Sequence, residues 1–308
     1  ERERERERES HYAPIGVSNF LRSQSVQELL SITAVSCLLC AMSFSGSSVG
    51  SGGRTSRRAF EFGRTYVVRP KGRHQATIVW LHGLGDNGAS WSQLLETLPL
   101  PNIKWICPTA PSQPVTLFGG FPSTAWFDVS DLSENGHDDL EGLDASAAHV
   151  ASLLSTEPTD IKLGLGGFSM GAATSLYSAT CFALGKYGND NPYPSNLSAI
   201  VGLSGWLPCS KNLSNKIEGV DEAARRAASL PIMLCHGRGD DVVPYKFGEK
   251  SSQALISSGF QDVTFKSYNG LGHYTIPEEM NEVAKSSSDC ETCPKKKKIV
   301  VIVRYMVQ

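Results

Sequence analysis

Five residues, Gly167-Phe168-Ser169-Met170-Gly171, predict a sharp turn between a strand and a helix. An apolar run from Ile161 to Gly166 precedes them, and a run of small residues with a helical pattern follows from Ala172 to Ala183. The pattern G-x-S-x-G is typical of a nucleophile elbow, in which glycines let neighbouring backbone approach a strained serine closely. The same pattern alone also fits an ordinary Gly/Ser turn, and the flanking strand and helix favour the elbow.

Short apolar runs rich in β-branched residues alternate with helical patterns along most of the chain. This alternation is typical of βαβ units and predicts an α/β fold, with a mainly parallel central sheet and helices on both faces. The predicted strands are Thr65 to Arg69, Thr77 to Leu81, Lys104 to Cys107, Ile161 to Gly166, Ala199 to Leu203, Pro231 to Cys235 and Val263 to Tyr268. The predicted helices are about 89 to 97, 141 to 155, 171 to 184, 221 to 229 and 246 to 258.

A single domain is predicted between two tails of different composition. Residues 1 to 59 begin with alternating Glu and Arg and end in a Ser/Gly/Arg-rich stretch, which predicts a disordered extension and a linker. Residues 26 to 42 are apolar but too short and too polar for a membrane span, so we expect no stable membrane insertion. The predicted domain covers residues 60 to 284, and the Ser- and Lys-rich residues 285 to 308 form an atypical C-terminal tail.

The net charge and the cysteine content limit which partners, compartments and metal ions we expect for this chain. The chain has 29 basic and 31 acidic residues and a net charge of -2, which argues against nucleic acid and anionic membranes as partners. Eight cysteines without a disulfide-dense spacing predict reduced thiols in a cytosolic or nuclear compartment, of which we favour the cytoplasm. Cys290-x-x-Cys293 has half of a zinc-site spacing, but no second pair follows, so we expect no metal.

Candidate chemical groups follow four of the predicted strands. His82, Ser169, His236 and His273 each come after the end of a strand. The carboxyl ends of parallel strands lie at one edge of a sheet, where ligands bind in folds of this class. The four side chains are therefore expected along the same edge.

A serine hydroxyl needs a base, and a neutral imidazole suits this role near neutral pH. His273 lies on a Gly-rich loop after the last strand and is the favoured base, whereas His82 and His236 precede glycines, where a histidine more often organises local hydrogen bonds. A carboxylate must orient the base. Asp240 and Asp241 both follow the strand that ends at Cys235, and spacing alone does not separate them.

An oxyanion formed at the serine needs two hydrogen-bond donors. The backbone N–H of Met170 at a helix N-terminus is one candidate, and that of Leu84 in the turn His82-Gly83-Leu84-Gly85 is the other. That turn also fits a plain tight loop. The segment from Pro114 to Phe127 is loop-like and dense in apolar residues, and it fits either a satellite core or the wall of an acyl pocket.

Seven motifs resemble those of the acyl-protein thioesterase and carboxylesterase family, in particular its plant members, and they follow one another in the same order as in that family. They cover residues 60 to 283, nearly the whole predicted domain. The motifs are WLHGLGD (80 to 86), PTAP (108 to 111), WFD (126 to 128), GGFSMG (166 to 171), LSGWLP (203 to 208), CHGRGDDVVP (235 to 244) and YNGLGHY (268 to 274). The resemblance implies an α/β-hydrolase fold, no cofactor, and hydrolysis of thioesters or oxyesters, with S-acylated proteins or small acyl esters as substrates.

The family's functional residues carry over by position. Ser169 matches the nucleophile, His273 the base and Asp240, rather than Asp241, the acid of a catalytic triad. The resemblance also assigns the oxyanion donors to Leu84 and Met170. The commoner animal form has Gln at the position of Met170. Because the oxyanion donor is the backbone N–H and not the side chain, this difference is not expected to remove activity.

Three residues are expected to contact substrate, and two segments depart from the family. Leu117 and Phe118 fall in the segment that covers the acyl channel in relatives, and Trp126 follows in the same aromatic-rich stretch. Residues 182 to 196 resemble an insertion that forms a surface loop in plant members. After Val283 the family continues into a C-terminal helix, whereas this chain continues into the Ser- and Lys-rich tail.

Overall fold

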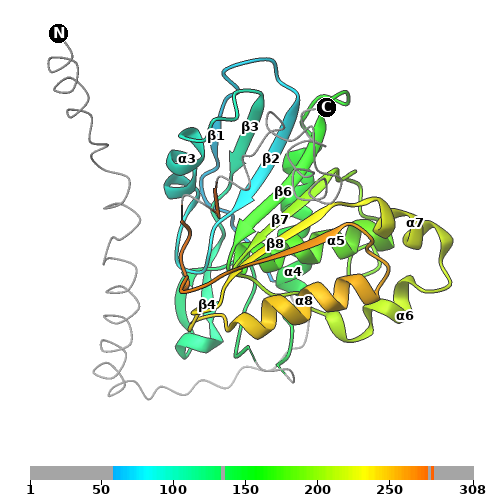
Figure 1. Cartoon of the computed structure of the whole chain (residues 1–308). Coiled ribbons are helices and arrows are strands. Elements are labelled where there is room, and N and C mark those ends of the chain that lie inside the picture. The colour runs from blue at the N-terminus through cyan, green and yellow to red at the C-terminus, as the bar shows by residue number, and fades with distance from the viewer. Residues whose placement is uncertain (1–57, 133–135, 277–278, 281–308) are drawn as a thin grey trace, which may run out of the picture. The chain divides into compact units, whose positions relative to one another are not determined.

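The computed structural model describes residues 58–132, 136–276 and 279–280. A seven-stranded sheet runs through them in the order β1-β3-β2-β6-β7-β8-β9 (Figure 1). Its strands are β1 (Tyr66–Val68), β2 (Ala76–Leu81), β3 (Ile103–Cys107), β6 (Lys162–Phe168), β7 (Ala199–Leu203), β8 (Ile232–Gly237) and β9 (Val263–Tyr268). Only β1 is antiparallel to its neighbour, so the predicted, mainly parallel sheet is confirmed.

Several predictions concern residues that the structure does not describe. They are the extension before residue 58, the apolar stretch 26 to 42, the tail 285 to 308, the Cys290 and Cys293 pair, and the departure after Val283. The boundaries of the domain at residues 60 and 284 therefore stay predictions.

The seven predicted strands are the seven strands of the sheet, with shifts at their ends. Strand β6 continues to Phe168 and β8 to Gly237, both two residues beyond the predicted ends. The sheet thus extends up to the residues on which the candidate chemistry depends. Strand pairing supplies the reason, since Phe168 pairs with Leu203 and Gly237 with Tyr268 on neighbouring strands.

The loop predicted between Pro114 and Phe127 is partly wrong. Strand β4 (Ser112–Val115) and strand β5 (Phe121–Thr124) pair there as a separate antiparallel hairpin, with a short 3₁₀ helix, η1 (Thr116–Phe118), in its turn. Each strand contains a proline, and Pro114 lies opposite Pro122. Proline weakens the sequence signal of a strand because it cannot donate to the ladder, which explains the missed hairpin.

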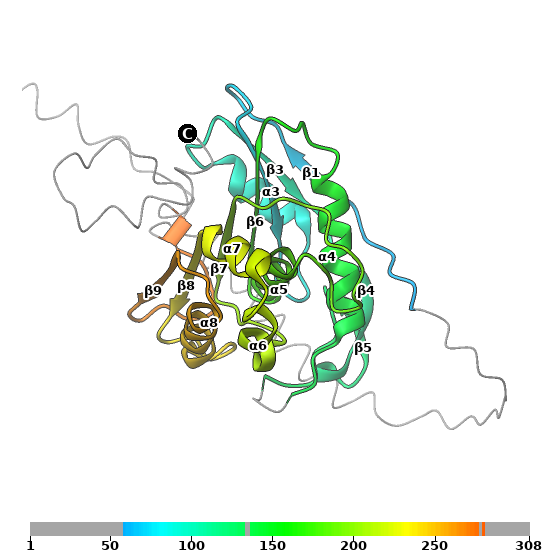
Figure 2. The ribbon, with the colours of Figure 1, turned by 90° about the vertical axis from the view of Figure 1, so that its right-hand side faces the viewer.

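Helices cover both faces of the sheet, as predicted (Figure 2). Helix α3 (Gly88–Glu96) packs on one face, where Trp91 contacts Trp80 with ring centroids 5.3 Å apart. The other face packs against α4 (Leu140–Leu154), α5 (Met170–Leu184), α6 (Leu213–Ile217), α7 (Asp221–Ser229) and α8 (Tyr245–Ser257). The sequence did not predict the five-residue α6 or the short 3₁₀ helix before it, η2 (Ser210–Asn212). The other helices on this face were predicted.

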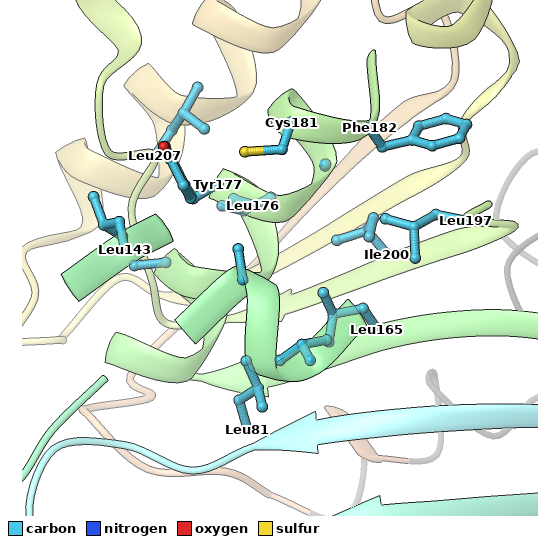
Figure 3. Packing of buried hydrophobic residues seen from close by; sticks show 14 of the residues in the cluster. Leu81, Leu143, Leu165, Leu176, Tyr177, Cys181, Phe182, Leu197, Ile200 and Leu207 are labelled. Atoms are coloured by element: carbon cyan, nitrogen blue, oxygen red, sulfur yellow. The ribbon is translucent and has the colours of Figure 1, made fainter. Parts of the chain in front are cut away.

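Helix α5 is buried on almost every side. Its residues are mostly small, and all but Leu184 are buried. Leu81, Leu165 and Ile200 of the sheet lie toward it, next to Leu176 (Figure 3). An all-round apolar helix of this kind is fixed by packing rather than by amphipathicity. The packing therefore holds the N-terminus of α5, and with it Ser169, rigidly against the sheet.

The predicted surface loop at residues 182 to 196 is only partly on the surface. Helix α5 continues to Leu184, and Tyr187 and Tyr193 are buried with their rings 5.2 Å apart. Asp144 of α4 accepts hydrogen bonds from the backbone N–H groups of Gly188 and Asn189, both at 2.8 Å. A buried carboxylate thus anchors the loop to α4.

Candidate active site

Ser169 lies at the turn between β6 and α5 in a strained backbone conformation. Its φ of 55° and ψ of -119° are unusual for a residue with a side chain. A Cβ on Gly167 would come within 2.5 Å of the Gly171 carbonyl carbon, and one on Gly171 within 2.6 Å of the His82 carbonyl oxygen. Glycine is therefore required at both positions, and the turn has the geometry predicted for a nucleophile elbow.

A chain of two hydrogen bonds links Ser169, His273 and Asp240. The Ser169 Oγ atom lies 3.0 Å from His273 Nε2, and His273 Nδ1 lies 2.8 Å from Asp240 Oδ2. An ionised carboxylate only accepts hydrogen bonds, so Nδ1 carries a hydrogen and donates it. Nε2 is then free to accept the hydroxyl hydrogen of Ser169. The three residues come from the ends of three strands, β6, β8 and β9.

Asp240 is the carboxylate beside His273, and Asp241 is exposed to solvent. Burial by itself would raise the pKa of Asp240, but hydrogen bonds from His236 and His273, together with the electrostatic interaction with His273, hold it well below its usual range. The backbone N–H groups of Val242 and Val243 donate to Oδ1 at 3.0 and 2.8 Å. Asp240 therefore stays ionised where it faces the imidazole.

His82 organises the turn that follows β2. Its Nε2 accepts a hydrogen bond from the Ala110 N–H at 3.0 Å, so Nδ1 carries the hydrogen and donates to the Gly83 carbonyl oxygen at 2.6 Å. Burial lowers the pKa of His82, which keeps the ring in this neutral form. Both of its nitrogens are used locally, as expected for a histidine in this position.

The two backbone amides predicted as oxyanion donors belong to the residue after Ser169 and to a turn that packs against Ser169. Met170 is the first residue of α5, and a Cβ on Gly83 would lie 3.4 Å from the Ser169 Cβ, which places the turn before Leu84 against the elbow. Within the described part of the chain, neither the Met170 nor the Leu84 N–H has a hydrogen-bond acceptor. Free amides next to a serine hydroxyl are suited to stabilise a negative oxygen.

The β4–β5 hairpin is hydrogen-bonded to the turn that follows β2. The Gly85 N–H donates to the Thr124 carbonyl oxygen at 2.9 Å, and the Thr124 hydroxyl donates to the Asp86 carbonyl oxygen at 2.7 Å. The missed hairpin therefore supports the turn that carries Leu84.

The three predicted substrate contacts have different environments. Leu117 in η1 is 49% exposed, and Phe118 is partly buried against the core. Trp126 is fully buried, and its indole N–H donates to the His82 carbonyl oxygen at 2.8 Å. With no exposed surface of its own, Trp126 is expected to support the turn before Leu84 rather than to touch substrate.

A cavity of about 370 Å³ lies among the loops at this edge. Its lining is partly apolar and partly polar or charged, and it includes none of the three hydrogen-bonded residues Ser169, His273 and Asp240. The larger apolar lining residues are Phe127, Trp206, Leu207 and Phe247. Trp206 follows Gly205, at which a Cβ would lie 3.0 Å from the Ser169 carbonyl oxygen. Trp206 and Phe247 were not predicted as site residues, although the motif LSGWLP after β7 was the signal that could have found Trp206.

The described residues contain neither a metal-binding cluster nor a membrane-spanning helix. No group of three or more His, Cys, Asp or Glu side chains there is arranged to hold a metal ion. None of the helices in the described ranges has the length and apolar character needed to cross a membrane.

Known proteins share both the sequence pattern and the fold. The model of the phospholipase/carboxylesterase family matches residues 63–290. The chain is 33% identical over 240 residues to an acyl-protein thioesterase 1 homolog of Dictyostelium discoideum, covering 75% of this chain and 96% of that protein. The crystal structure of Zea mays acyl-protein thioesterase 2 is 76% identical with a TM-score of 0.71, covering 72% of this chain and 96% of that one.

A second plant structure is more distant. Arabidopsis thaliana SOBER1 is 28% identical with a TM-score of 0.55, over 68% of this chain and 96% of that one. The parallel sheet, the covering helices and these matches confirm the α/β-hydrolase fold that the sequence motifs implied. The chain therefore belongs to the phospholipase/carboxylesterase family of α/β-hydrolase enzymes.

Proposed function

We propose that the protein is a serine hydrolase that cleaves acyl thioesters, with S-acylated proteins as its substrates. The observation that carries the proposal is the hydrogen-bonded chain from Ser169 through His273 to Asp240 at a strained elbow. The names of the thioesterase relatives support the substrate class. A carboxylesterase or lysophospholipase activity is the alternative, supported by the description of the family.

In the acylation half-reaction, the Ser169 Oγ attacks the carbonyl carbon of the thioester while His273 Nε2 takes the hydroxyl proton. The negative charge that forms on the carbonyl oxygen is stabilised by the N–H groups of Leu84 and Met170. When the tetrahedral intermediate collapses, the C–S bond breaks and His273 returns the proton to the leaving thiolate. The products are a free thiol and an acyl ester on Ser169.

Hydrolysis of that ester uses the same groups. Water attacks the acyl carbon and gives a proton to His273 Nε2, and the oxyanion again accepts the two backbone hydrogen bonds. The bond between the acyl carbon and Ser169 Oγ then breaks, and His273 returns the proton to the serine. Asp240 stays ionised throughout and stabilises the imidazolium in both halves.

We also propose that the acyl chain enters the cavity beside Trp206, along the apolar floor that Phe127, Trp206 and Phe247 form among its polar and charged lining residues. Phe127 and Trp206 contact each other with ring centroids 6.0 Å apart and form part of this floor. A contact with one additional methylene is worth about 1–3 kcal/mol in an apolar pocket, so chain-length preference has to be measured. Rates on thioesters and oxyesters from acetyl to palmitoyl, together with a lysophospholipid, separate the substrate classes.

Labelling with a fluorophosphonate probe tests the nucleophile. The unaltered protein is expected to be labelled, and Ser169→Ala is expected to lose both labelling and thioester hydrolysis. Ser152→Ala is the matched control, because Ser152 is an exposed serine on α4. Persistent labelling of Ser169→Ala would show that another residue is the nucleophile.

The compartment is proposed from the cysteines. Cys107, Cys181, Cys209 and Cys235 form no disulfide bond within the described part of the chain. Free thiols persist in a reducing compartment, which supports the cytoplasm as the site of action. Fractionation of cells that express the full chain is the test.

A further inference from the structure

His236 lies at the end of β8 and contacts the same carboxylate as His273. It is 1% exposed, and its Nε2 lies 2.7 Å from the Val243 carbonyl oxygen and 3.3 Å from Asp240 Oδ2. A carbonyl oxygen only accepts hydrogen bonds, so Nε2 carries a hydrogen. That N–H is shared between Val243 and Asp240.

We propose that His236 is a positioning residue for the reaction, and this inference rests on the proposed function. His236 ties the segment from Asp240 to Val243 back to the end of β8. Val243 is hydrogen-bonded to both residues, because its N–H donates to Asp240 Oδ1 at 2.8 Å while its carbonyl oxygen accepts from His236. The Asp240 carboxylate is thereby fixed at both oxygens.

The contact matters because Oδ2 faces two histidines at once. The Asp240 side chain is fully buried, and among the described residues His236 and His273 are the two donors to Oδ2. Without His236, His273 would be the one donor left to Oδ2 among the described residues, and the carboxylate would otherwise be held only through Oδ1. A carboxylate that rotates would move the imidazole relative to Ser169, and a misplacement of about 1 Å can cost about 10²-fold in rate.

The surroundings leave His236 little freedom to move. Helix α8 approaches it so closely that a Cβ on Gly248 would collide with its Nδ1 atom. The Tyr245 ring meets the imidazole edge-on, with centroids 6.0 Å apart. The ionisable groups that contact His236 are Asp240 and Tyr245, Asp240 in turn contacts His273, and the charge of Asp240 acts on the buried Glu279. The imidazole is thus held rigidly while it donates to Asp240.

The inference is tested by kinetics on His236→Leu and His236→Gln in two backgrounds. Leucine removes the donor, and the glutamine amide can replace it. We expect His236→Leu to lower kcat about 10- to 100-fold with KM changed less than about twofold, and His236→Gln to lose less than about fivefold. In the Asp240→Asn background, His236→Leu is expected to change kcat less than about twofold, because the two residues act as one unit.

His149→Leu is the matched control for loss of a buried histidine. The His149 ring stacks on Phe62 with centroids 3.8 Å apart, and neither residue belongs to the candidate site. All rates are measured well below the melting temperature of each variant. An equal loss from His236→Leu in both backgrounds, or no loss in the unaltered background, would overturn the inference. If Asp240→Asn itself leaves kcat unchanged, the proposed triad fails instead.

Discussion

His82 Nδ1 lies 2.6 Å from the carbonyl oxygen of Gly83, within the turn that leads to Leu84. The peptide bond between Gly83 and Leu84 is trans, so its C=O and N–H groups point in opposite directions. By holding the carbonyl, His82 fixes the direction of the Leu84 N–H. A hydrogen bond to the carbonyl also polarises the peptide and strengthens the N–H as a donor.

Replacing His82 is therefore expected to weaken stabilisation of the oxyanion. His82→Leu should lower kcat about 10- to 100-fold, less than the loss of about 10²- to 10³-fold typical of removing a whole donor. His82→Asn should retain more activity, because its amide nitrogen can replace Nδ1. Steady-state kinetics on a thioester is the measurement, and equal kcat values for the two variants would contradict the assigned role.

Met170→Gln should separate activity from stability. The side chain of Met170 is buried in the apolar core, whereas the proposed oxyanion donor is its backbone N–H. We expect kcat to stay within about threefold and the free energy of unfolding to fall by about 1–3 kcal/mol, the cost of burying an amide without partners. Steady-state kinetics measures kcat, and urea unfolding measures the free energy of unfolding. A large drop in kcat at unchanged stability would show that the Met170 side chain takes part in the reaction.

Stability should fall as pH rises through the range set by Glu279. Burial, followed by the negative charge of Asp240, raises the pKa of this carboxyl from 4.5 to about 8, despite an opposing backbone hydrogen bond at Ile276. Between these values the folded chain holds a proton that the unfolded chain has lost, so raising the pH favours unfolding. Thermal melting across this range should show a decline that Glu279→Gln reduces, and an unchanged pH slope in that variant would contradict the prediction.

Asp240 acts in a separate pH range. Its pKa is lowered in the folded chain, so its contribution to stability is present above its unfolded value of 3.8 and is lost as the pH falls through the folded value. The decline attributed to Glu279 begins only above about 4.5, the unfolded value for a glutamate. The two effects are distinguishable in one melting series.

Asp144→Ala should destabilise the fold without changing the chemistry. The carboxylate accepts from the Tyr177 hydroxyl at 2.6 Å and from the Gly188 and Asn189 N–H groups. A buried donor left without a partner costs about 1–3 kcal/mol, so we expect a loss of at least about 2 kcal/mol. Chemical denaturation measures the loss, and kcat well below the melting temperature should remain that of the unaltered chain. A stability change below about 0.5 kcal/mol would mean that the loop is held by other contacts.

The sequence by itself determined the sheet and the elbow. The inner strands of the sheet were predicted because buried parallel strands are continuous apolar runs, and this signal is local. The turn at Ser169 was predicted because its glycines must lie within two residues of the serine. The hairpin of β4 and β5 was missed, since its opposed prolines hide the strand signal and its pairing depends on the rest of the fold.

The tertiary structure alone decided how the distant groups meet. Asp240 and Asp241 are equivalent by spacing, and only the path of the loop after β8 brings Asp240 to within 2.8 Å of a histidine 33 positions away. The burial of Trp126 likewise depends on a distant neighbour, because its indole N–H donates to the carbonyl oxygen of His82, the residue that follows β2. Contacts over such separations follow from the packing of the whole sheet, and no local pattern of residues encodes them.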